Sequence, residues 1–491
     1  MKDLKEKAIR GGFARLGAQG ASFALRLGSL MILARLLAPA DFGLVGMVAA
    51  FTGVLTLLRD FGLSCATIQR ATVTEEQISN LFWINLIVGG ALGLLLAAVA
   101  PEIAVFYHEP RLTAVTAVLA VGFLFNAAGV QHGAVLQRQM RFSALAIIDT
   151  AAQAVGIAAG VAGALAGYGY WALVVMTILP PLVGTIAYWI VTGWVPQLPS
   201  RGAGVRSMVN FGGILTMNGL AVYVATNFEK VLLGRFWGAD AIGIYGRAYQ
   251  LVNIPIANLN SAAGEVAFSA LSRVQDDPSR LRRYFLRGYD LILGVTVPVT
   301  AACALFADDI VHVCLGPKWS AAAPLLRLLA PTILVFAVAN PLSWLLMSLG
   351  LLKRSLQMTL VISPILIVSY LIGLPHGPKG VAFAYSAVML AWIFPLIAWA
   401  VHGTAISFRD ILRSAYKPLL SGAVAGALAL AFRAAWGAAL SPLPRLILET
   451  TVLFVAFASM LLASGQKAIY LDLLRELTRS TPREQQSLVS N

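Results

Sequence analysis

Five polar residues near the start of the chain recur at a spacing that places them on one face of a helix. Arg15, Gln19, Ser22, Arg26 and Ser29 follow one another at intervals of four, three, four and three residues, which is the helical period. An arginine inside an apolar helix is costly, so it normally faces a bundle interior or an aqueous cavity. Because guanidinium binds phosphate oxygens through paired donors, this face could bind a phosphorylated ligand.

Two further polar faces are expected in the middle of the chain. The first comprises Thr216, Tyr223, Asn227 and Lys230, and the second comprises Tyr245, Tyr249, Asn253 and Asn260. Aromatic rings cover the apolar C–H faces of sugars and amides bond to hydroxyls, so both faces could bind a glycan. Polar side chains also hold membrane helices together, and this structural role is the alternative for both.

Acidic residues beside apolar segments could couple transport to H⁺ or Na⁺, because burial changes the charge state of a carboxylate. Glu265 is one candidate, and Asp60, in the string Arg59–Asp60–Phe61–Gly62, is another. Asp149 and Asp290 occupy similar places. A helix cap or a salt bridge is the alternative for each acid, so the coupling ion stays unassigned. Three further charged residues in apolar segments have no evident partner in the sequence: Arg327, Arg433 and Glu449.

The composition indicates which elements must carry these residues. Of the 491 residues, 59% are hydrophobic and 12% are charged, and the mean hydropathy is +0.80. Soluble proteins have about 25% charged residues. The formal charge of +14 is therefore attributed mainly to membrane loops rather than to nucleic-acid binding. The cysteines and histidines have no metal-ligand spacing, and no nucleotide-binding or hydrolase motif is present. We therefore expect no metal, no cofactor and no enzyme activity.

Positive charge is concentrated in every second gap between the apolar segments. The opposite gaps hold little of it, chiefly Arg111, Lys318 and Lys379. Lys and Arg mark the cytoplasmic loops of membrane proteins. The pattern therefore predicts a multi-pass protein of the bacterial inner membrane with both termini in the cytoplasm.

We predict an all-α polytopic membrane protein with about fourteen transmembrane helices, at roughly 20 residues per crossing. The spans are expected near 13–37, 42–63, 81–105, 112–135, 146–166, 170–193, 209–235, 242–268, 286–306, 323–348, 356–374, 380–402, 418–436 and 445–464. The predicted domains are an N-terminal six-helix bundle (1–193), a cytoplasmic connector (194–208), a C-terminal six-helix bundle (209–402), two additional transmembrane helices (403–464) and a cytoplasmic tail (465–491).

The two predicted bundles share a short repeat at an offset of 200 residues. Arg35, Gly43 and Gly46 in ARLLAPADFGLVG match Arg235, Gly243 and Gly246 in GRFWGADAIGIYG. Each string follows the first long span of its half. Six spans is an even number, so both halves enter the membrane in the same direction. Parallel repeats of this kind are one common plan of transporters.

Several strings in the N-terminal third are similar to those of a known family. They are LARLLAPADFGLVGM, LLRDFGLSCATIQR, TEEQISNLFWINLIVG and LQRQMRFSALAIID. They resemble the polysaccharide-transporter branch of the multidrug/oligosaccharidyl-lipid/polysaccharide exporter superfamily. The resemblance implies a Wzx-type flippase, which moves undecaprenyl-diphosphate-linked oligosaccharide repeat units across the inner membrane by alternating access. It implies a role in exopolysaccharide, capsule or O-antigen biosynthesis, with membrane lipids, a polysaccharide polymerase and chain-length machinery as partners.

The implied cargo gives the polar residues candidate roles. Arg26 is the candidate ligand of the diphosphate, with Arg15 at the cytoplasmic mouth and Arg59 and Lys230 as further candidates. The candidate glycan ligands are Gln19, Ser22, Tyr223, Asn227, Tyr249 and Asn253. A structural ion pair is the alternative for Arg26, and contact with lipid headgroups is the alternative for Arg15.

Two other functional classes were compared with the flippase. A cation-coupled multidrug exporter of the same superfamily would carry a carboxylate deep in the first bundle, and the first four predicted spans have no central acid. A membrane glycosyltransferase or polymerase would normally carry a large periplasmic loop with catalytic residues. The longest expected outside loop, 307–322, has Asp308, Asp309 and Lys318 as its charged residues. The sequence therefore favours the flippase.

Overall fold

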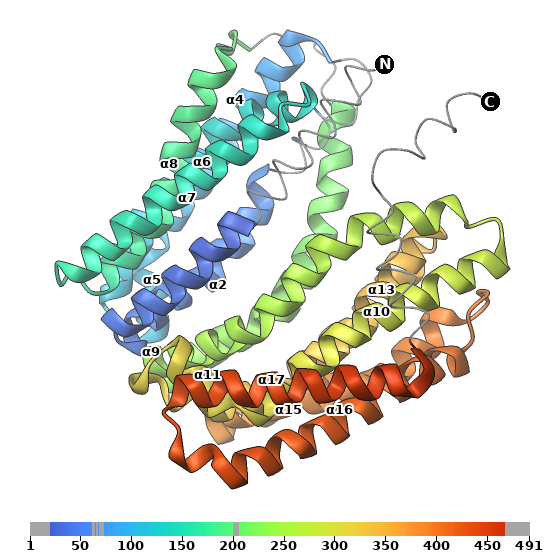
Figure 1. Cartoon of the computed structure of the whole chain (residues 1–491). Coiled ribbons are helices and arrows are strands. Elements are labelled where there is room, and N and C mark those ends of the chain that lie inside the picture. The colour runs from blue at the N-terminus through green and yellow to red at the C-terminus, as the bar shows by residue number, and fades with distance from the viewer. Residues whose placement is uncertain (1–19, 61–63, 65–66, 68–72, 200–205, 467–491) are drawn as a thin grey trace. The chain divides into compact units, whose positions relative to one another are not determined.

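The computed structural model describes residues 20–60, Ser64, Thr67, 73–199 and 206–466. Within these ranges, only the backbone is described for 59–60, 206–222, 258–259, 261–263, 265–266, 438 and 465–466. The described residues are mostly helical and contain no strand (Figure 1). The predicted all-α polytopic fold is confirmed.

A helix over 20–36 precedes the labelled elements. These are α2 (Pro39–Asp60), α4 (Glu75–Ala98), α5 (Ala100–Tyr107), α6 (Arg111–Arg138), α7 (Phe142–Leu165), α8 (Tyr170–Thr192), α9 (Arg206–Arg273), α10 (Pro278–Leu305), α11 (Ala307–Cys314), α12 (Ala322–Leu329), α13 (Pro331–Ser348), α14 (Leu352–Gly373), α15 (Gly377–Val401), α16 (Phe408–Trp436) and α17 (Pro442–Leu461).

Ten helical segments among the described residues are long and apolar enough to cross a membrane. One of them, Leu352–Val401, contains two of the predicted spans. The helix α9 contains another two, separated by Gly238, whose φ of 79° and ψ of −174° are not helical. The first predicted span, 13–37, begins outside the described residues. The total of fourteen spans therefore stays a prediction.

Local sequence signals explain where several helices begin. Thr74 caps α4 by accepting from the backbone N–H of Gln77, whose side chain accepts in return from Thr74. Ser407 and Asp410 form the same reciprocal cap at the start of α16. Each such cap satisfies backbone donors that have no partner within the helix. Proline acts differently: the predicted span 81–105 is interrupted at the start of α5, where Pro lies in the first two positions, because proline lacks the N–H that continues a helix.

The first of two compact units comprises Met1–Arg247, Cys314–Trp319 and Leu366–Val381. Small residues allow its helices to approach closely. A Cβ on Gly89 of α4 would lie 2.4 Å from the Cβ of Ala127 in α6. A Cβ on Gly156 of α7 would lie 2.5 Å from the ring of Pro180 in α8. Both contacts require glycine.

The second unit comprises Ala248–Val313, Ser320–Ile365 and Ala382–Asn491. Its core contains Phe285, Tyr289, Leu345 and Phe457, all less than 5% exposed. The helices α16 and α17 lie side by side and are joined by a short connection (Figure 1). These two compact units do not test the predicted division of the chain into six, six and two spans, which stays a prediction.

Candidate functional site

The helix over 20–36 carries the candidate diphosphate ligand. Arg26 is exposed, and its guanidinium forms no hydrogen bond or ion pair with the residues that the structure describes. Ser29 Oγ donates to the carbonyl of Arg26 at 2.9 Å, and Ser22 Oγ lies 3.5 Å from Thr150 Oγ1 of α7. A side chain that is charged, exposed and unpaired in a membrane helix requires water or an anion. This geometry suits a phosphate ligand.

The opposite side of the same helix is mainly apolar and lines a cavity. Arg26 and Arg35 are nine residues apart, which is about two and a half turns, so they point to opposite sides. A cavity of about 440 Å³ lies between this helix and α7 on the Arg35 side. It is lined by Gly28, Met31, Ile32, Arg35, Leu36, Val161 and Leu165. The helix therefore presents a polar face and a separate apolar groove with one cation.

The structure brings together three of the predicted residues on α9. Lys230 Nζ donates to Asn227 Oδ1 at 2.5 Å, and Asn227 Nδ2 donates to the carbonyl of Tyr223 at 3.0 Å. The hydroxyl of Tyr223 donates to the carbonyl of Ala49 in α2 at 3.2 Å. Gly53 makes room for this ring, since a Cβ there would lie 1.7 Å from the Tyr223 hydroxyl. Tyr223 therefore also joins α9 to α2.

Tyr249 and Asn253 are the other predicted glycan ligands on α9. Tyr249 is half-buried and Asn253 is exposed, and both belong to the second unit, whereas Arg26 and Lys230 belong to the first. Arg15 and Gln19 lie outside the described residues, as do the side chains of Arg59, Asp60 and Glu265. The roles of all these residues stay predictions.

The predicted repeat has a structural counterpart in the first unit. A Cβ on Gly43 would lie 1.8 Å from the carbonyl oxygen of Ala239, and a Cβ on Gly243 would lie 1.9 Å from that of Pro39. Ala239 follows Pro39 at the same offset of 200 residues. The start of α2 and the part of α9 after Gly238 therefore cross with reciprocal contacts.

A second pair of contacts involves Ala34 and Gly234, which are also 200 residues apart. Trp319 Nε1 donates to the carbonyl of Ala34 at 2.7 Å, while the ring of Tyr107 packs where a Cβ on Gly234 would lie, 2.6 Å away. Arg235, the counterpart of Arg35, donates to His108 Nδ1 at 2.8 Å. The loop after the third predicted span (81–105) thus contacts the second half of the sequence. The loop after the ninth predicted span (286–306) contacts the first half.

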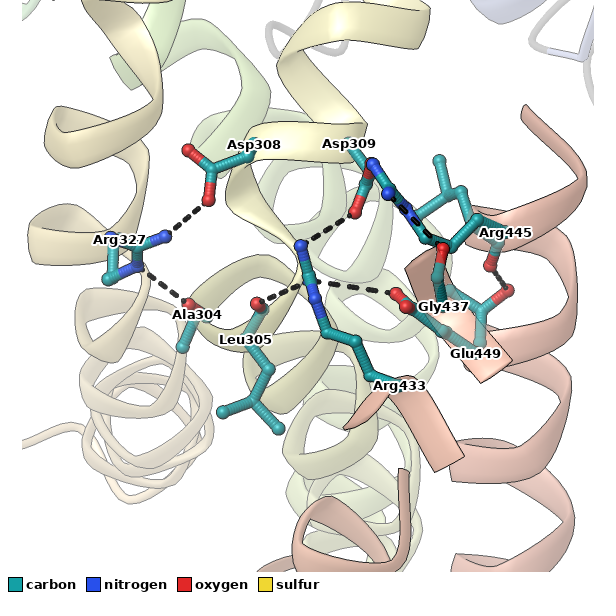
Figure 2. A network of polar contacts seen from close by, with 11 residues as sticks. Ala304, Leu305, Asp308, Asp309, Arg327, Arg433, Gly437, Arg445 and Glu449 are labelled. Carbon is teal, nitrogen blue, oxygen red and sulfur yellow. Dashed lines mark hydrogen bonds and ion pairs between the residues drawn. The ribbon is translucent and has the colours of Figure 1, made fainter. Parts of the chain in front are cut away.

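The charged residues that lacked evident partners in the sequence are paired in the second unit. The carboxylate of Asp309, 1% exposed, lies 3.1 Å from Arg433 Nη2 and accepts from Arg445 Nε at 3.0 Å. Figure 2 shows the guanidinium of Arg433 between Asp309 and Glu449, whose Oε2 lies 3.6 Å from Arg433 Nη1. These four residues, termed the Asp309 clasp below, join α11 to α16 and α17. Their place at the joint between three helices gives them a structural role.

Three other acids considered from the sequence also have partners. Arg327 Nη2 donates to Asp308 at 2.7 Å on the surface. Ser414 Oγ donates to Asp290 at 2.5 Å, and the hydroxyl of Tyr188 donates to Asp149. Sequence reasoning gave Glu229 of α9 no role, although it is 2% exposed. The sequence feature that could have identified Glu229 is its position as an acidic residue in the middle of an apolar span.

A match to a family model shows which protein family this chain belongs to. The model described as "Polysaccharide biosynthesis protein" matches residues 32–324, which is more than half of the chain. The chain belongs to this polysaccharide biosynthesis protein family. The resemblance noted in the sequence, to the polysaccharide transporters of the exporter superfamily, is thereby confirmed.

Two relatives of this polysaccharide biosynthesis protein illustrate the family. The teichuronic acid biosynthesis protein TuaB of Bacillus subtilis is 30% identical over 58% of this chain and 59% of its own length. The lipopolysaccharide biosynthesis protein WzxC of Escherichia coli is 26% identical over 84% of this chain and 83% of its own. The protein is therefore a multi-pass membrane protein of a polysaccharide biosynthesis family.

The fold has a counterpart among solved structures. The lipid II flippase MurJ, in an inward closed conformation, superposes with a TM-score of 0.72 and covers 95% of this chain and 100% of its own. The two sequences are 12% identical. The likeness shows a shared fold.

Proposed function

We propose that the protein is a flippase for undecaprenyl-diphosphate-linked oligosaccharide repeat units, which it moves from the cytoplasmic to the periplasmic leaflet by alternating access. The product would enter exopolysaccharide, capsule or O-antigen synthesis, with a polysaccharide polymerase and chain-length machinery as further partners. The carrying observation is Arg26, which is exposed and has no partner among the described residues, on a predicted membrane helix of a polysaccharide biosynthesis family member.

The chemistry of such a cargo fits the two sides of the helix over 20–36. A diphosphate needs cationic donors, and guanidinium supplies two parallel ones. A polyprenyl chain needs an apolar path, and the groove beside α7 is lined mainly by aliphatic side chains. Binding of the diphosphate has to be moderate, because a site that binds too tightly does not release its cargo.

The first experiment is mass spectrometry of polyprenyl-linked lipids in membranes from a deletion strain and its complemented parent. The proposal expects one diphosphate-linked oligosaccharide to accumulate, accessible to added enzymes on the cytoplasmic side only, and to disappear on complementation. An unchanged lipid pool with the surface polymer intact, in a strain without a second flippase, would contradict the proposal. Drug hypersensitivity of that strain would then favour the multidrug exporter.

Complementation with variants tests the assigned ligand. Arg26→Gln should reduce transport roughly 10- to 100-fold, as expected for the loss of one or two charge-assisted hydrogen bonds, and Arg26→Lys should retain part of it. The matched control is Arg327→Gln, which removes an exposed arginine from the ion pair with Asp308 and should transport normally. Wild-type transport by a correctly inserted Arg26→Gln protein would exclude the role of Arg26.

A further inference from the structure

The short 3₁₀ turn Pro317–Trp319 is anchored to the helix over 20–36 by its tryptophan. Trp319 is 0% exposed, and its indole Nε1 donates to the carbonyl of Ala34 at 2.7 Å. Its ring also lies edge-on to Phe42 of α2, with the ring centroids 5.3 Å apart. All these residues belong to the first unit. The anchor therefore determines where the preceding residue, Lys318, lies.

The anchor brings Lys318 to Arg35, so that two cations lie together. Lys318 Nζ donates to the carbonyl oxygen of Arg35 at 3.5 Å, and a Cβ on Gly316 would lie 3.5 Å from Arg35 Cγ. The side chains of Arg35 and Lys318 are both exposed, and Lys318 forms no ion pair with the residues that the structure describes. The nearby acid Asp41 accepts from the backbone N–H of Ala38. This place therefore carries a local excess of positive charge.

The two cations adjoin the apolar cavity between the helix over 20–36 and α7. Arg35 is the one charged residue that lines it, and the other lining residues are Gly28, Met31, Ile32, Leu36, Val161 and Leu165. Ile32 and Leu165 are exposed, as expected for side chains that face lipid. A groove with apolar walls and positive charge beside it fits a ligand that has an anionic headgroup and a hydrocarbon chain.

The size of the groove and the number of cations both favour a polyprenyl diphosphate over a phospholipid. At about 30 Å³ per carbon, close to the share of a water molecule, the cavity of about 440 Å³ holds roughly fifteen carbon atoms. This is one stretch of a single chain, whereas a phospholipid has two chains. A diphosphate carries negative charge on each of its two phosphates, which matches Arg35 and Lys318. Phosphatidylglycerol has a single phosphate.

We propose that Arg35, Lys318 and the adjoining groove form a second lipid site, which binds a polyprenyl diphosphate at the expected periplasmic end of the helix over 20–36. The choice of ligand rests on the proposed function. Arg35 lies nine residues after Arg26, about 13 Å along the axis, and on the opposite side of the helix. The second site therefore holds the lipid-linked product after translocation, with its diphosphate on the two cations and its chain in the groove.

Photolabelling of the full-length protein in phosphatidylcholine nanodiscs tests the site. The probe is farnesyl diphosphate with a photoreactive diazirine on its hydrocarbon chain, and mass spectrometry of the digested protein locates the label. The proposal expects label on residues 28–36 and 161–165, displaced by unlabelled farnesyl diphosphate and not by the same concentration of phosphatidylglycerol. Displacement by phosphatidylglycerol, or equal labelling by photoreactive farnesol, which has no diphosphate, overturns the assignment.

Variants test the cations and the groove separately. Arg35→Gln and Lys318→Gln should each reduce the labelling roughly tenfold, as expected for the loss of a charge-assisted hydrogen bond. Val161→Trp fills the groove and should abolish the labelling. The matched control is Lys379→Gln, which removes another exposed lysine of the first unit and should be labelled like wild type. The unfolding temperature shows that each variant is folded. Unchanged labelling of the Arg35→Gln/Lys318→Gln double variant overturns the role of the cations.

Two comparisons separate this site from the proposed function and from Arg26. Arg26→Gln should keep the labelling of residues 28–36 and 161–165, and loss of that label would overturn the existence of a second site. If the deletion strain accumulates no diphosphate-linked oligosaccharide while the purified protein is labelled as expected, the proposed function fails and the lipid site stands. Accumulation in the strain without labelling of the protein overturns the lipid site alone.

Discussion

Gly43 of α2 and Gly243 of α9 lie at one helix crossing and make equivalent contacts, each with the other helix. A side chain on Gly43 would meet the carbonyl of Ala239, and a side chain on Gly243 would meet the carbonyl of Pro39. The Cβ position of Gly243 is also 3.3 Å from the backbone nitrogen of Gly43. The crossing thus joins corresponding positions of the two repeats through backbone atoms, which cannot move aside as side chains can.

Replacement of either glycine by alanine should separate the two helices. The new methyl group would meet backbone at less than 2 Å, so we expect a loss of stability of about 1–3 kcal/mol, typical of overpacking, and reduced transport. Thermal unfolding in detergent and the complementation assay measure the two effects. Gly246→Ala is the control, because a Cβ on Gly246 meets nothing within 4 Å.

The double variant Gly43→Ala/Gly243→Ala provides a sharper measurement. Once one methyl group has separated α2 and α9, the second methyl group requires less additional separation. The two losses should therefore not add, and the double variant should be more stable than their sum predicts. Additive losses would mean that the two glycines act at separate places.

The Asp309 clasp predicts a large difference between two adjacent aspartates. Asp309→Asn leaves Arg433 and Arg445 without the anion between them, and removal of one partner from a buried ion pair costs about 3–5 kcal/mol. Asp308→Asn breaks an ion pair whose two side chains are 49% and 57% exposed, and such pairs contribute about 0–1 kcal/mol. Unfolding temperatures of the two purified variants should differ accordingly. Equal temperatures would show that the clasp does not hold α16 and α17.

Cys314 offers a pH-dependent measurement in a segment outside the candidate membrane spans. Burial raises the pKa of its thiol, and the positive charge of Arg35 opposes this effect. Since the thiolate is the reactive form, maleimide labelling should be slow near pH 7 and should rise about tenfold per pH unit until the thiol has titrated. The measurement uses a Cys65→Ser/Cys303→Ser background.

Removal of the neighbouring charge tests the electrostatic part of this prediction. Arg35→Gln should raise the pKa of Cys314 further and slow its labelling at pH 8. Glutathione labelled in the same buffers provides the reference for an unperturbed thiol. Labelling of Cys314 as fast as glutathione at pH 7 would contradict the raised pKa.

The helical fold was predictable because the signals that specify it are local and strong. Apolar segments of membrane length and the glycine pattern around residues 43 and 243 can both be recognised from short stretches of sequence. The interruption of the third span at α5 was missed, since hydropathy does not register a proline that ends a helix without making it polar.

The pairing of charges was less predictable, because it depends on contacts between residues distant in the sequence. Arg433 and Glu449 had no evident partner in the sequence, whereas in the structure Arg433 lies close to both Asp309 and Glu449. Tyr223 was predicted as a glycan ligand from its helical face, and its hydroxyl also contacts α2. Glu229 was given no role, although it is an acid in an apolar segment and is 2% exposed in the structure.

The Asp309 clasp also imposes an order on biogenesis. The ribosome delivers Asp309 first, and Arg445 emerges 136 residues later. Until α16 and α17 have been made and inserted, this aspartate lacks both of its counter-charges. A chain terminated before Arg433 would therefore leave Asp309 of the second unit without either of the arginines that pair with it.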